Sequence, residues 1–229
     1  MIPLRDSIPS RSFPGTTIAL IAANAAVFLY QLSLGPGYGE AFVATFGAVP
    51  AAITGALHAA APLPPPLTIV SSMFLHGGVL HLLGNMVFLW IFGNNVEDAL
   101  GHLRFLVFYL LCGVAGALAH VVTSPASTVP MVGASGAISG VLGAYFLLYP
   151  HARIVTLVFL GFLAQTVSIP AFYFLGFWFL MQLLSGAATA GRAGGGVAFL
   201  AHVGGFVAGL GLLVPFKRRR VRLWSPLSG

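Results

Sequence analysis

Long apolar runs separated by short polar segments follow one another along the whole chain. A helix needs about 20 predominantly apolar residues to cross the hydrocarbon core of a bilayer. The runs that approach this length span residues 16–34, 71–92, 103–122, 133–149, 170–186 and 197–216. The pattern therefore predicts an all-α membrane protein with six transmembrane helices.

Two further segments are apolar but do not fit a spanning helix. Residues 154–164 form a short run that ends near Gln165, Ser168 and Pro170, which favours an interfacial or re-entrant piece. Residues 35–67 contain a run of prolines and carry one charge, and we expect an external loop that rests on the outer membrane interface.

Composition excludes a water-soluble fold. Hydrophobic residues make up 58% of the 229 residues, charged residues only 6%, and the mean hydropathy is +0.98; soluble domains carry roughly 25% charged residues. The first apolar run lacks a clear cleavage site and is interpreted as a retained span. Cys112 is the only cysteine, which excludes an intrachain disulfide and a cysteine-based zinc site.

The net charge of +6 would favour nucleic-acid binding in a soluble protein, but here the basic residues sit at the chain ends and in loops. With the N-terminus in the cytoplasm, every Lys and Arg except Arg192 falls on the cytoplasmic side, as the positive-inside rule requires. The prediction is a cytoplasmic tail at 1–15, a six-span domain at 16–216 and a basic cytoplasmic tail at 217–229. The compact form and charge bias favour a bacterial inner membrane, with membrane lipids and no nucleic acid as partners.

Polar side chains inside the predicted spans are functional candidates, because a polar group in a bilayer is costly without a partner or a wet cavity. Those that stand out are His76, His81, Asn85, His120, Ser135, Ser139 and His202. The second, fourth and sixth spans run in the same direction, so their N-terminal portions share the outer half of the membrane. These portions hold His76, His81, Asn85, Ser135 and His202.

Ser135 and His202 suit nucleophilic catalysis. A rise of about 1.5 Å per residue puts both roughly 3 to 9 Å below the starts of their helices. A serine needs a base to remove its proton, and an imidazole can serve. His81 and Asn85 share one face of the second helix by their i, i+4 spacing and add side-chain donors, whereas His76 belongs to the entrance of that helix. All acidic residues except Glu40 fall on the cytoplasmic side, which favours a dyad.

The same residues allow other interpretations. Ser135 lies among small residues that also mediate helix packing, and so does the Gly205-x3-Gly209 pair. Three histidines without i, i+4 spacing or an acidic partner argue against a catalytic metal, and no cofactor is expected. Glu97 and Asp98 suggest a solvated cytoplasmic turn. The aromatic run 172–179 is interpreted mostly as lipid-facing or packing surface. A transporter is disfavoured because the two halves show no duplication.

The assembled motifs resemble those of the rhomboid intramembrane serine proteases. The matching pieces are His76-x4-His81-x3-Asn85, Gly133-Ala134-Ser135-Gly136 and Ala201-His202-x2-Gly205-x3-Gly209. The resemblance implies an endopeptidase that cuts transmembrane protein substrates, with Ser135 as nucleophile and His202 as general base and acid. It also implies an oxyanion hole made by Asn85, His81 and the Ser135 N–H and shaped by Gly133.

Two departures from the family pattern are visible. The segment 35–67 lacks the Trp-Arg pair of many members, and Ser139 stands where many members have an aromatic that supports the histidine ring. The orientation of His202 therefore has no evident support. An alternative is a non-proteolytic rhomboid-like protein that binds transmembrane helices.

Overall fold

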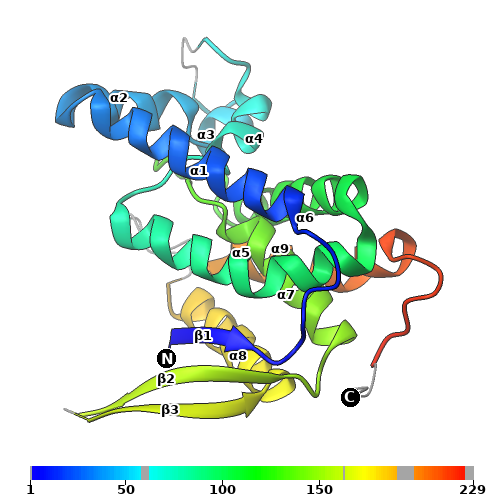
Figure 1. The fold of residues 1–229 in the computed structure, drawn as a ribbon. Coiled ribbons are helices and arrows are strands. Elements are labelled where there is room, and N and C mark those ends of the chain that lie inside the picture. The colour runs from blue at the N-terminus through cyan, green and yellow to red at the C-terminus, as the bar shows by residue number, and fades with distance from the viewer. Residues whose placement is uncertain (1, 58–61, 162, 190–198, 225–229) are drawn as a thin grey trace.

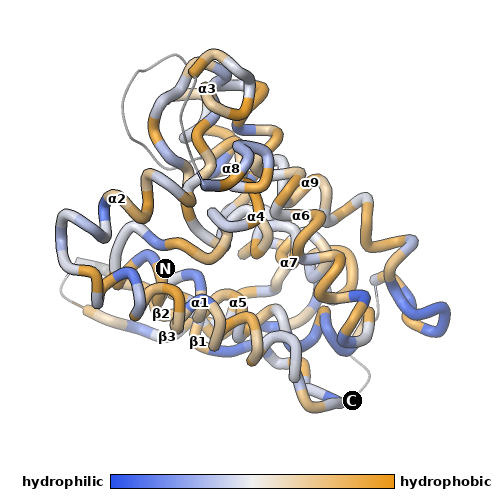
Figure 2. Tube along the Cα trace, turned by 90° about the horizontal axis from the view of Figure 1, so that it is seen from above, coloured by the Kyte–Doolittle hydropathy of each residue, from blue (hydrophilic) through white to orange (hydrophobic). Residues whose placement is uncertain are grey.

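The computed structural model describes residues 2–57, 62–161, 163–189 and 199–224, and most of them are helical (Figure 1). Within these residues, five helices are long and apolar enough to cross a membrane. They are α1 (Gly15–Ser33), α5 (Val79–Leu100), α6 (His102–Thr123), α8 (Ala171–Thr189) and α9 (Phe199–Phe216). A sixth apolar helix, α7 (Ser135–Leu148), has only 14 residues. Hydrophobic residues prevail along these helices (Figure 2), so the chain is a multi-pass membrane protein.

The second predicted span is misplaced. Residues 71–92 do not form one helix: α4 (Thr68–Ser72) ends first, and α5 begins only at Val79 and continues to Leu100. Gly77 and Gly78 lie just before α5, where glycine disfavours a continuous helix by about 1 kcal/mol per residue. His76 falls in this interruption, at the helix entrance. The predicted start of the sixth span, residue 197, lies outside the described residues, as does Arg192.

The segment 35–67, which is expected to be an external loop, contains short helices. This segment contains α2 (Pro36–Phe46), α3 (Pro50–Ile53) and the 3-10 turn η1 (Pro65–Leu67). Each of these elements has a proline at its first or second position, where the fixed φ of proline suits a helix start. With α4 they occupy the end of the molecule away from the sheet (Figure 1).

A three-stranded antiparallel sheet adds to the helical fold. The segment 154–164, predicted to be interfacial or re-entrant rather than a spanning helix, lies in a hairpin of β2 (Arg153–Leu160) and β3 (Leu163–Pro170). β1 (Ile2–Asp6) pairs with the free edge of β2. β2 is rich in β-branched and aromatic residues, which suit strands.

Asp6 anchors the sheet to the helices. Its carboxylate accepts hydrogen bonds of 2.6 Å from Asn95 Nδ2 on α5 and from Tyr145 Oη on α7. Burial raises the pKa of Asp6 above its ordinary value, although the hydrogen bond from Tyr145 favours the ionised form. The N-terminal segment is therefore tied into the fold through a strand and a buried carboxylate.

Helices α6, α7 and α9 form the centre of the bundle, and glycines let them approach closely. A Cβ placed on Gly205 of α9 would overlap the carbonyl group of Gly136 on α7, and one on Gly209 would overlap that of Gly140. Most of α7 is buried against its neighbours. The prediction that Gly205-x3-Gly209 mediates helix packing is confirmed. These contacts also fix which residues of α7 lie beside which residues of α9.

Glu97 is not part of a solvated turn, contrary to expectation. Its side chain on α5 is 1% exposed and accepts hydrogen bonds of 2.8 Å from the N–H groups of Thr16 and Thr17 at the start of α1. His102 Nδ1 lies 2.5 Å from the same carboxylate. An acidic group at a helix N-terminus satisfies free N–H donors and complements the helix dipole. Asp98 likewise accepts from the backbone of Arg11.

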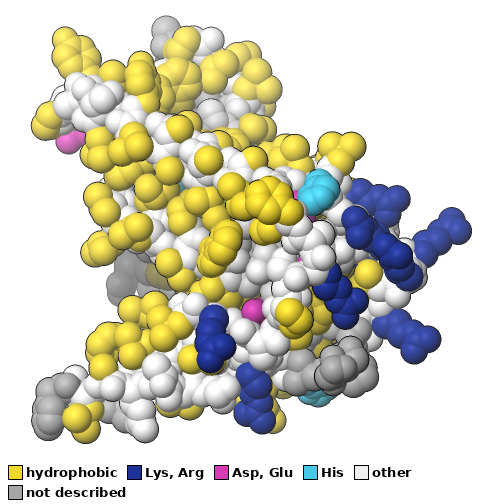
Figure 3. Space-filling view, viewed as in Figure 1, with side chains coloured by type: hydrophobic (Ala, Val, Ile, Leu, Met, Phe, Trp, Pro, Cys, Tyr) yellow, Lys and Arg dark blue, Asp and Glu magenta, His cyan; other side chains and the backbone are white. Residues whose placement is uncertain are grey.

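The basic side chains gather at one end of the molecule (Figure 3). In this view they lie at the right and below, near β1, the start of α6 and the segment after α9, whereas α2, the helix that carries Glu40, lies at the upper left. The distribution in space therefore agrees with the charge asymmetry that is visible along the sequence.

Candidate active site

Ser135 and His202 are in direct contact. Ser135 is the first residue of α7, and His202 lies in the first turn of α9. The Nε2 atom of His202 is 2.8 Å from the Oγ atom of Ser135. The contact lies next to the place where α7 and α9 cross. Gly136 follows Ser135, Gly205 follows His202 by three residues, and the two glycines are in contact. The structure thus brings the predicted serine and histidine together at hydrogen-bonding distance.

Asn85 and His76 form a buried pair next to this contact. Asn85 Nδ2 lies 3.0 Å from His76 Nε2, and both side chains are buried. The backbone carbonyl of His76 accepts a 2.9 Å hydrogen bond from Gln31 Nε2 on α1, which fixes the entrance of α5. An asparagine amide carries two N–H donors. One donor serves His76, and the second remains for another acceptor.

His81 is the third polar side chain of this group. The backbone N–H of Gly77 donates to its Nδ1 atom across 3.4 Å. A neutral imidazole then carries its proton on Nε2. This Nε2 lies against the segment before Ser135, because a Cβ built on Gly133 would be 2.8 Å from it. His81 therefore presents an N–H donor toward the start of α7.

Gly133 shapes the backbone in front of Ser135. Its φ of +120° is a conformation that side-chain-bearing residues rarely adopt. Its N–H is already donated to the Ser72 carbonyl, at 2.9 Å. The N–H groups in the first turn of α7 receive no side-chain cap, so the Ser135 N–H stays free to bind an anion. Asn85 Nδ2 is 3.5 Å from the same Cβ position, so these donors converge on one place.

The hydroxyl of Ser139 bonds within its own helix. Its Oγ donates to the carbonyl oxygen of Ser135 one turn earlier, at 2.6 Å, and the side chain is fully buried. The serine thus bonds within α7, as membrane helices allow.

The support for His202 comes from α8 instead, which the sequence reasoning missed. Gln182 Oε1 is 2.8 Å from His202 Nδ1, and the ring centroid of Trp178 is 6.0 Å from that of His202 at 35°. Trp178 and Gln182 are spaced i, i+4, so they share a face of α8. The signal was available, because Gln182 is a polar residue inside a predicted span.

The aromatic run of α8 is divided between lipid-facing and packing surface, as expected. Phe172, Tyr173 and Phe177 are exposed, whereas Phe174 is buried. Trp178 additionally packs on Phe206 of α9, with ring centroids 6.2 Å apart.

Within the described residues, no group of three or more His, Cys, Asp or Glu side chains is arranged to hold a metal. Asp6, Glu97 and Asp98 bond to the N-terminal segment, α1, α5 and α7 rather than to His202. The chemistry that this site can support is proton transfer from a serine hydroxyl to an imidazole, beside N–H donors that can stabilise an oxyanion.

Known proteins match the part of the chain that contains Ser135 and His202. The family model of the Rhomboid domain matches residues 64–219. The mitochondrial Rhomboid protein 1 of Saccharomyces cerevisiae is 33% identical over 150 residues, which are 63% of this chain and 40% of that protein. Rhomboid protease GluP of Bacillus subtilis is 37% identical over 147 residues, 64% of this chain and 26% of that protein.

These relatives are longer than the part that matches, since this chain covers less than half of each. The first relative is named as mitochondrial, and the second comes from a bacterium. The expectation of a bacterial inner membrane is therefore not supported. The Rhomboid model covers more than half of the chain, including α5, α7 and α9 with the site that they build. The chain therefore belongs to the rhomboid family.

Proposed function

We propose that this chain is an intramembrane serine endopeptidase that hydrolyses peptide bonds in or near the transmembrane helices of membrane proteins. The observation that carries the proposal is the 2.8 Å contact between His202 Nε2 and Ser135 Oγ inside an apolar helical bundle. A polar pair in such surroundings is costly to keep and marks a functional site. Membership of a family that includes a protein named as a protease supports the same reading.

Acylation begins when Ser135 Oγ attacks the carbonyl carbon of the scissile peptide bond. The hydroxyl proton passes to His202 Nε2, and the carbonyl oxygen becomes an oxyanion. The tetrahedral intermediate then breaks its C–N bond, and His202 returns the proton to the leaving amine. An ester between Ser135 and the N-terminal part of the substrate remains.

The oxyanion is stabilised by the donors that converge beside Gly133. These are the free N–H of Ser135, the second amide N–H of Asn85 and the Nε2–H of His81. Fixed donors aimed at developing charge are worth about 10²–10³ in kcat each. Gly133 has no side chain, so no Cβ crowds the imidazole of His81 at this place.

Deacylation repeats the steps with water as the nucleophile. His202 removes a proton from the water, the ester C–O bond breaks, and the proton returns to Ser135 Oγ. We assign α7 as the fourth of the six spans, in addition to the five longer helices: its 14 residues extend about 21 Å, less than the roughly 30 Å of the hydrocarbon core. A start recessed from the outer surface would let water reach Ser135.

The topology proposed here has both termini in the cytoplasm, tails at 1–15 and 217–229 and a six-span domain at 16–216. Substrates are single-pass membrane proteins, which approach laterally past α8 and the segment 35–67. α8 supports this route because its face with Trp178 and Gln182 covers His202, while its other face is exposed.

The test uses purified full-length protein in liposomes with a fluorophosphonate probe and a transmembrane reporter. Ser135→Ala and His202→Ala are expected to abolish labelling and cleavage, with circular dichroism unchanged. Ser33→Ala, which alters an exposed serine at the end of α1, is the matched control and should behave as wild type. Reporter cleavage by Ser135→Ala would contradict the proposal. Reporter binding without any labelling of wild type would instead identify a non-proteolytic binder of transmembrane helices.

A further inference from the structure

His202 is held from two sides by hydrogen bonds of equal length. Its Nε2 atom meets Ser135 Oγ and its Nδ1 atom meets Gln182 Oε1, both at 2.8 Å. Gln182 comes from α8, a different helix from those that carry the serine and the histidine. The bond therefore fixes the ring of His202 relative to a third element of the bundle.

The chemistry of the Gln182 bond selects one form of the imidazole. A carboxamide oxygen has lone pairs and no hydrogen, so it only accepts. His202 must then carry its proton on Nδ1, which leaves a lone pair on Nε2 that faces Ser135. This tautomer is the one that can remove the serine proton. The opposite tautomer would put an N–H on Nε2 and could not act as a base.

We infer that Gln182 is a positioning residue that holds His202 in the tautomer and orientation needed to deprotonate Ser135. The inference rests on the proposed function. It assigns the part that an acid plays in a Ser-His-Asp triad to a neutral amide. Trp178, one turn earlier on α8, packs on the imidazole and limits its rotation.

The test compares Gln182→Leu and Gln182→Glu with wild type in liposomes, by the rate of fluorophosphonate labelling across pH and by kcat and KM on the reporter. Leucine is similar in size to glutamine but has no hydrogen-bond acceptor. We therefore expect the labelling rate and kcat to fall about 10- to 100-fold, which lies within the roughly 10²–10⁴-fold rate enhancement that a general base supplies. KM should change little. Leu183→Ala, at an exposed neighbour on α8, is the packing control and should match wild type.

Gln182→Glu keeps an acceptor and adds a charge that stabilises the imidazolium. Labelling should persist, with its pH midpoint moved upward. Among the described residues, His81 is the titratable group that acts on His202, and it is unchanged in both variants. Wild-type rate and pH profile in Gln182→Leu, or an unshifted profile in Gln182→Glu, would overturn the inference while the proposed function stands. Absence of Ser135 labelling in wild type would overturn both.

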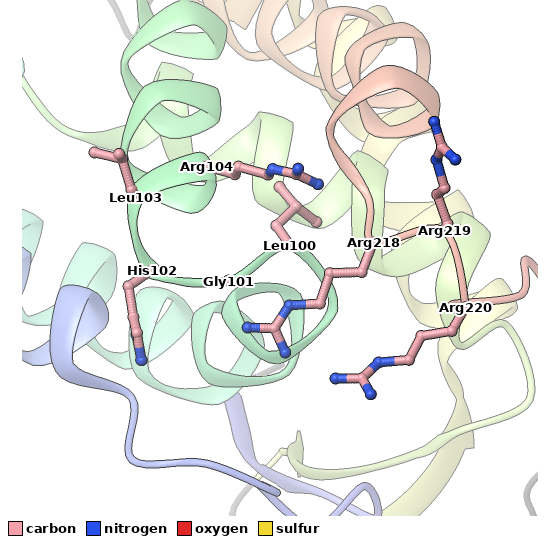
Figure 4. A pocket seen from close by; sticks show the side chains of 8 residues that line it. All are labelled: Leu100, Gly101, His102, Leu103, Arg104, Arg218, Arg219 and Arg220. Carbon is pink, nitrogen blue, oxygen red and sulfur yellow. The ribbon is translucent and has the colours of Figure 1, made fainter.

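A second feature lies at the opposite end of the bundle and is independent of the dyad. A pocket of about 690 Å³ opens between the α5–α6 junction and the segment after α9 (Figure 4). Its lining consists of Leu100, Gly101, His102, Leu103, Arg104, Arg218, Arg219 and Arg220. The side chains of Arg104, Arg218 and Arg220 extend into the same space.

The backbone fixes part of this pocket. Gly101 has a φ of +90°, and a Cβ on it would be 2.8 Å from Nη2 of Arg218, so the guanidinium lies directly over the glycine. The Arg218 N–H donates to the Ala99 carbonyl, at 3.0 Å, which ties the segment after α9 to the end of α5. The cluster is therefore held in place by contacts between two parts of the chain.

The positive charge of the arginines that line the pocket favours an anionic ligand. Within the described residues, no carboxylate pairs with Arg104, Arg218, Arg219 or Arg220. α6 begins at this place without a side-chain cap, so free N–H groups and the positive end of its dipole add to the arginines. Leu103 on the rim is 74% exposed, which places apolar surface next to the cations.

We propose that this pocket binds the phosphate group of an anionic phospholipid, whose acyl chains run along the exposed apolar surface near Leu103. Guanidinium groups bind phosphate through paired N–H donors, and basic pockets at the ends of membrane helices suit lipid headgroups. A phosphate ligand would relieve the repulsion between the arginines.

The test measures the melting temperature of the purified full-length protein in mixed phosphatidylglycerol–phosphatidylcholine bilayers against pure phosphatidylcholine. Phosphatidylglycerol should raise the melting temperature of wild type. The double variant Arg218→Gln/Arg220→Gln should lose most of this rise. Arg5→Gln/Arg153→Gln removes the same charge from the sheet and should keep it. Equal responses of the two double variants, or an equal rise with inorganic phosphate alone, would overturn the lipid site.

Discussion

Three polar side chains near Ser135 are oriented by hydrogen bonds to neighbouring groups. Gln182 accepts from His202, Gly77 donates to His81, and Asn85 shares its amide with His76. A site of this kind is organised before a substrate arrives, and such preorganisation is the main source of electrostatic catalysis. The consequence at the scale of residues is that single substitutions should lower kcat more than they raise KM.

Asn85→Ala is expected to reduce kcat for reporter cleavage by about 10²–10³, because one oxyanion donor is lost. KM should change little, since the donor acts on charge that develops only in the transition state. The measurement is steady-state cleavage in liposomes. Asn94→Ala, two and a half turns away on α5, is the control. A rise in KM with normal kcat would place Asn85 in substrate binding instead.

The site residues differ in how far the sequence could reveal them. Ser135 and His202 were found because a lone polar group stands out in an apolar span, and the positions within the spans predicted their similar depth. Gln182 was not among the polar candidates, although it lies in the predicted span 170–186. The tertiary structure shows that this residue, in the second half of α8, contacts His202.

At the scale of elements, glycine contacts set the distance between α7 and α9. The carbonyl groups of Gly136 and Gly140 lie where Cβ atoms on Gly205 and Gly209 would be. Ser135 and His202 lie in the first turns of α7 and α9, next to these glycine contacts. The spacing of the two helices therefore also sets the length of the hydrogen bond between Ser135 and His202.

Gly205→Ala should lower the melting temperature and slow labelling of Ser135, since forcing the helices apart typically costs about 1–3 kcal/mol. Gly211→Ala provides a matched control in the same helix, because a Cβ there would meet no atom within 4 Å. It should be neutral or stabilising, as alanine favours a helix over glycine by about 1 kcal/mol. Similar behaviour of the two variants would argue against the close crossing.

Glu97→Ala should loosen α1. Two backbone donors of α1 would lose their acceptor, and unsatisfied buried groups cost about 1–3 kcal/mol. Hydrogen exchange is the measurement: faster exchange should be confined to the first turns of α1. Glu40→Ala, which alters an exposed acid on α2, is the control. Unchanged exchange at Thr16 and Thr17 would show that the cap contributes little.

The positions of most helices followed from hydrophobic runs, but the sheet did not. Apolar residues in 154–164 fit a short helix or a strand equally well, and local pattern alone does not decide between them. The deciding contact is long-range, since β1 pairs with β2 across about 150 residues of sequence. The break before α5 was visible as Gly77-Gly78, yet the apolar residues on both sides favoured one continuous span.

At the scale of the whole molecule, charge divides the protein into two ends. The Lys and Arg side chains gather near the sheet and the start of α6, and α2 and α3 lie at the other end (Figures 1 and 3). Cationic segments are poorly translocated. The division therefore supports the proposal that the sheet and both termini face the cytoplasm.

Single-cysteine labelling can test this topology directly, because Cys112 is buried and is the chain's only cysteine. In sealed right-side-out vesicles, Tyr38→Cys on α2, where the tyrosine is 78% exposed, should react with a membrane-impermeant maleimide. Ser7→Cys and Arg219→Cys should react only after the vesicles are opened. Labelling of all three variants from one side would contradict the proposed arrangement.

The pairing of β1 with β2 also has a consequence for the order of synthesis. Residues 2–6 leave the ribosome long before residues 154–157, which are their partners in the sheet. Until then the strand has no neighbour, and Asp6 lacks the Tyr145 hydroxyl that it accepts from in the finished protein. β1 is thus fixed only after α7 has been made, and its attachment reports that α7 is in place.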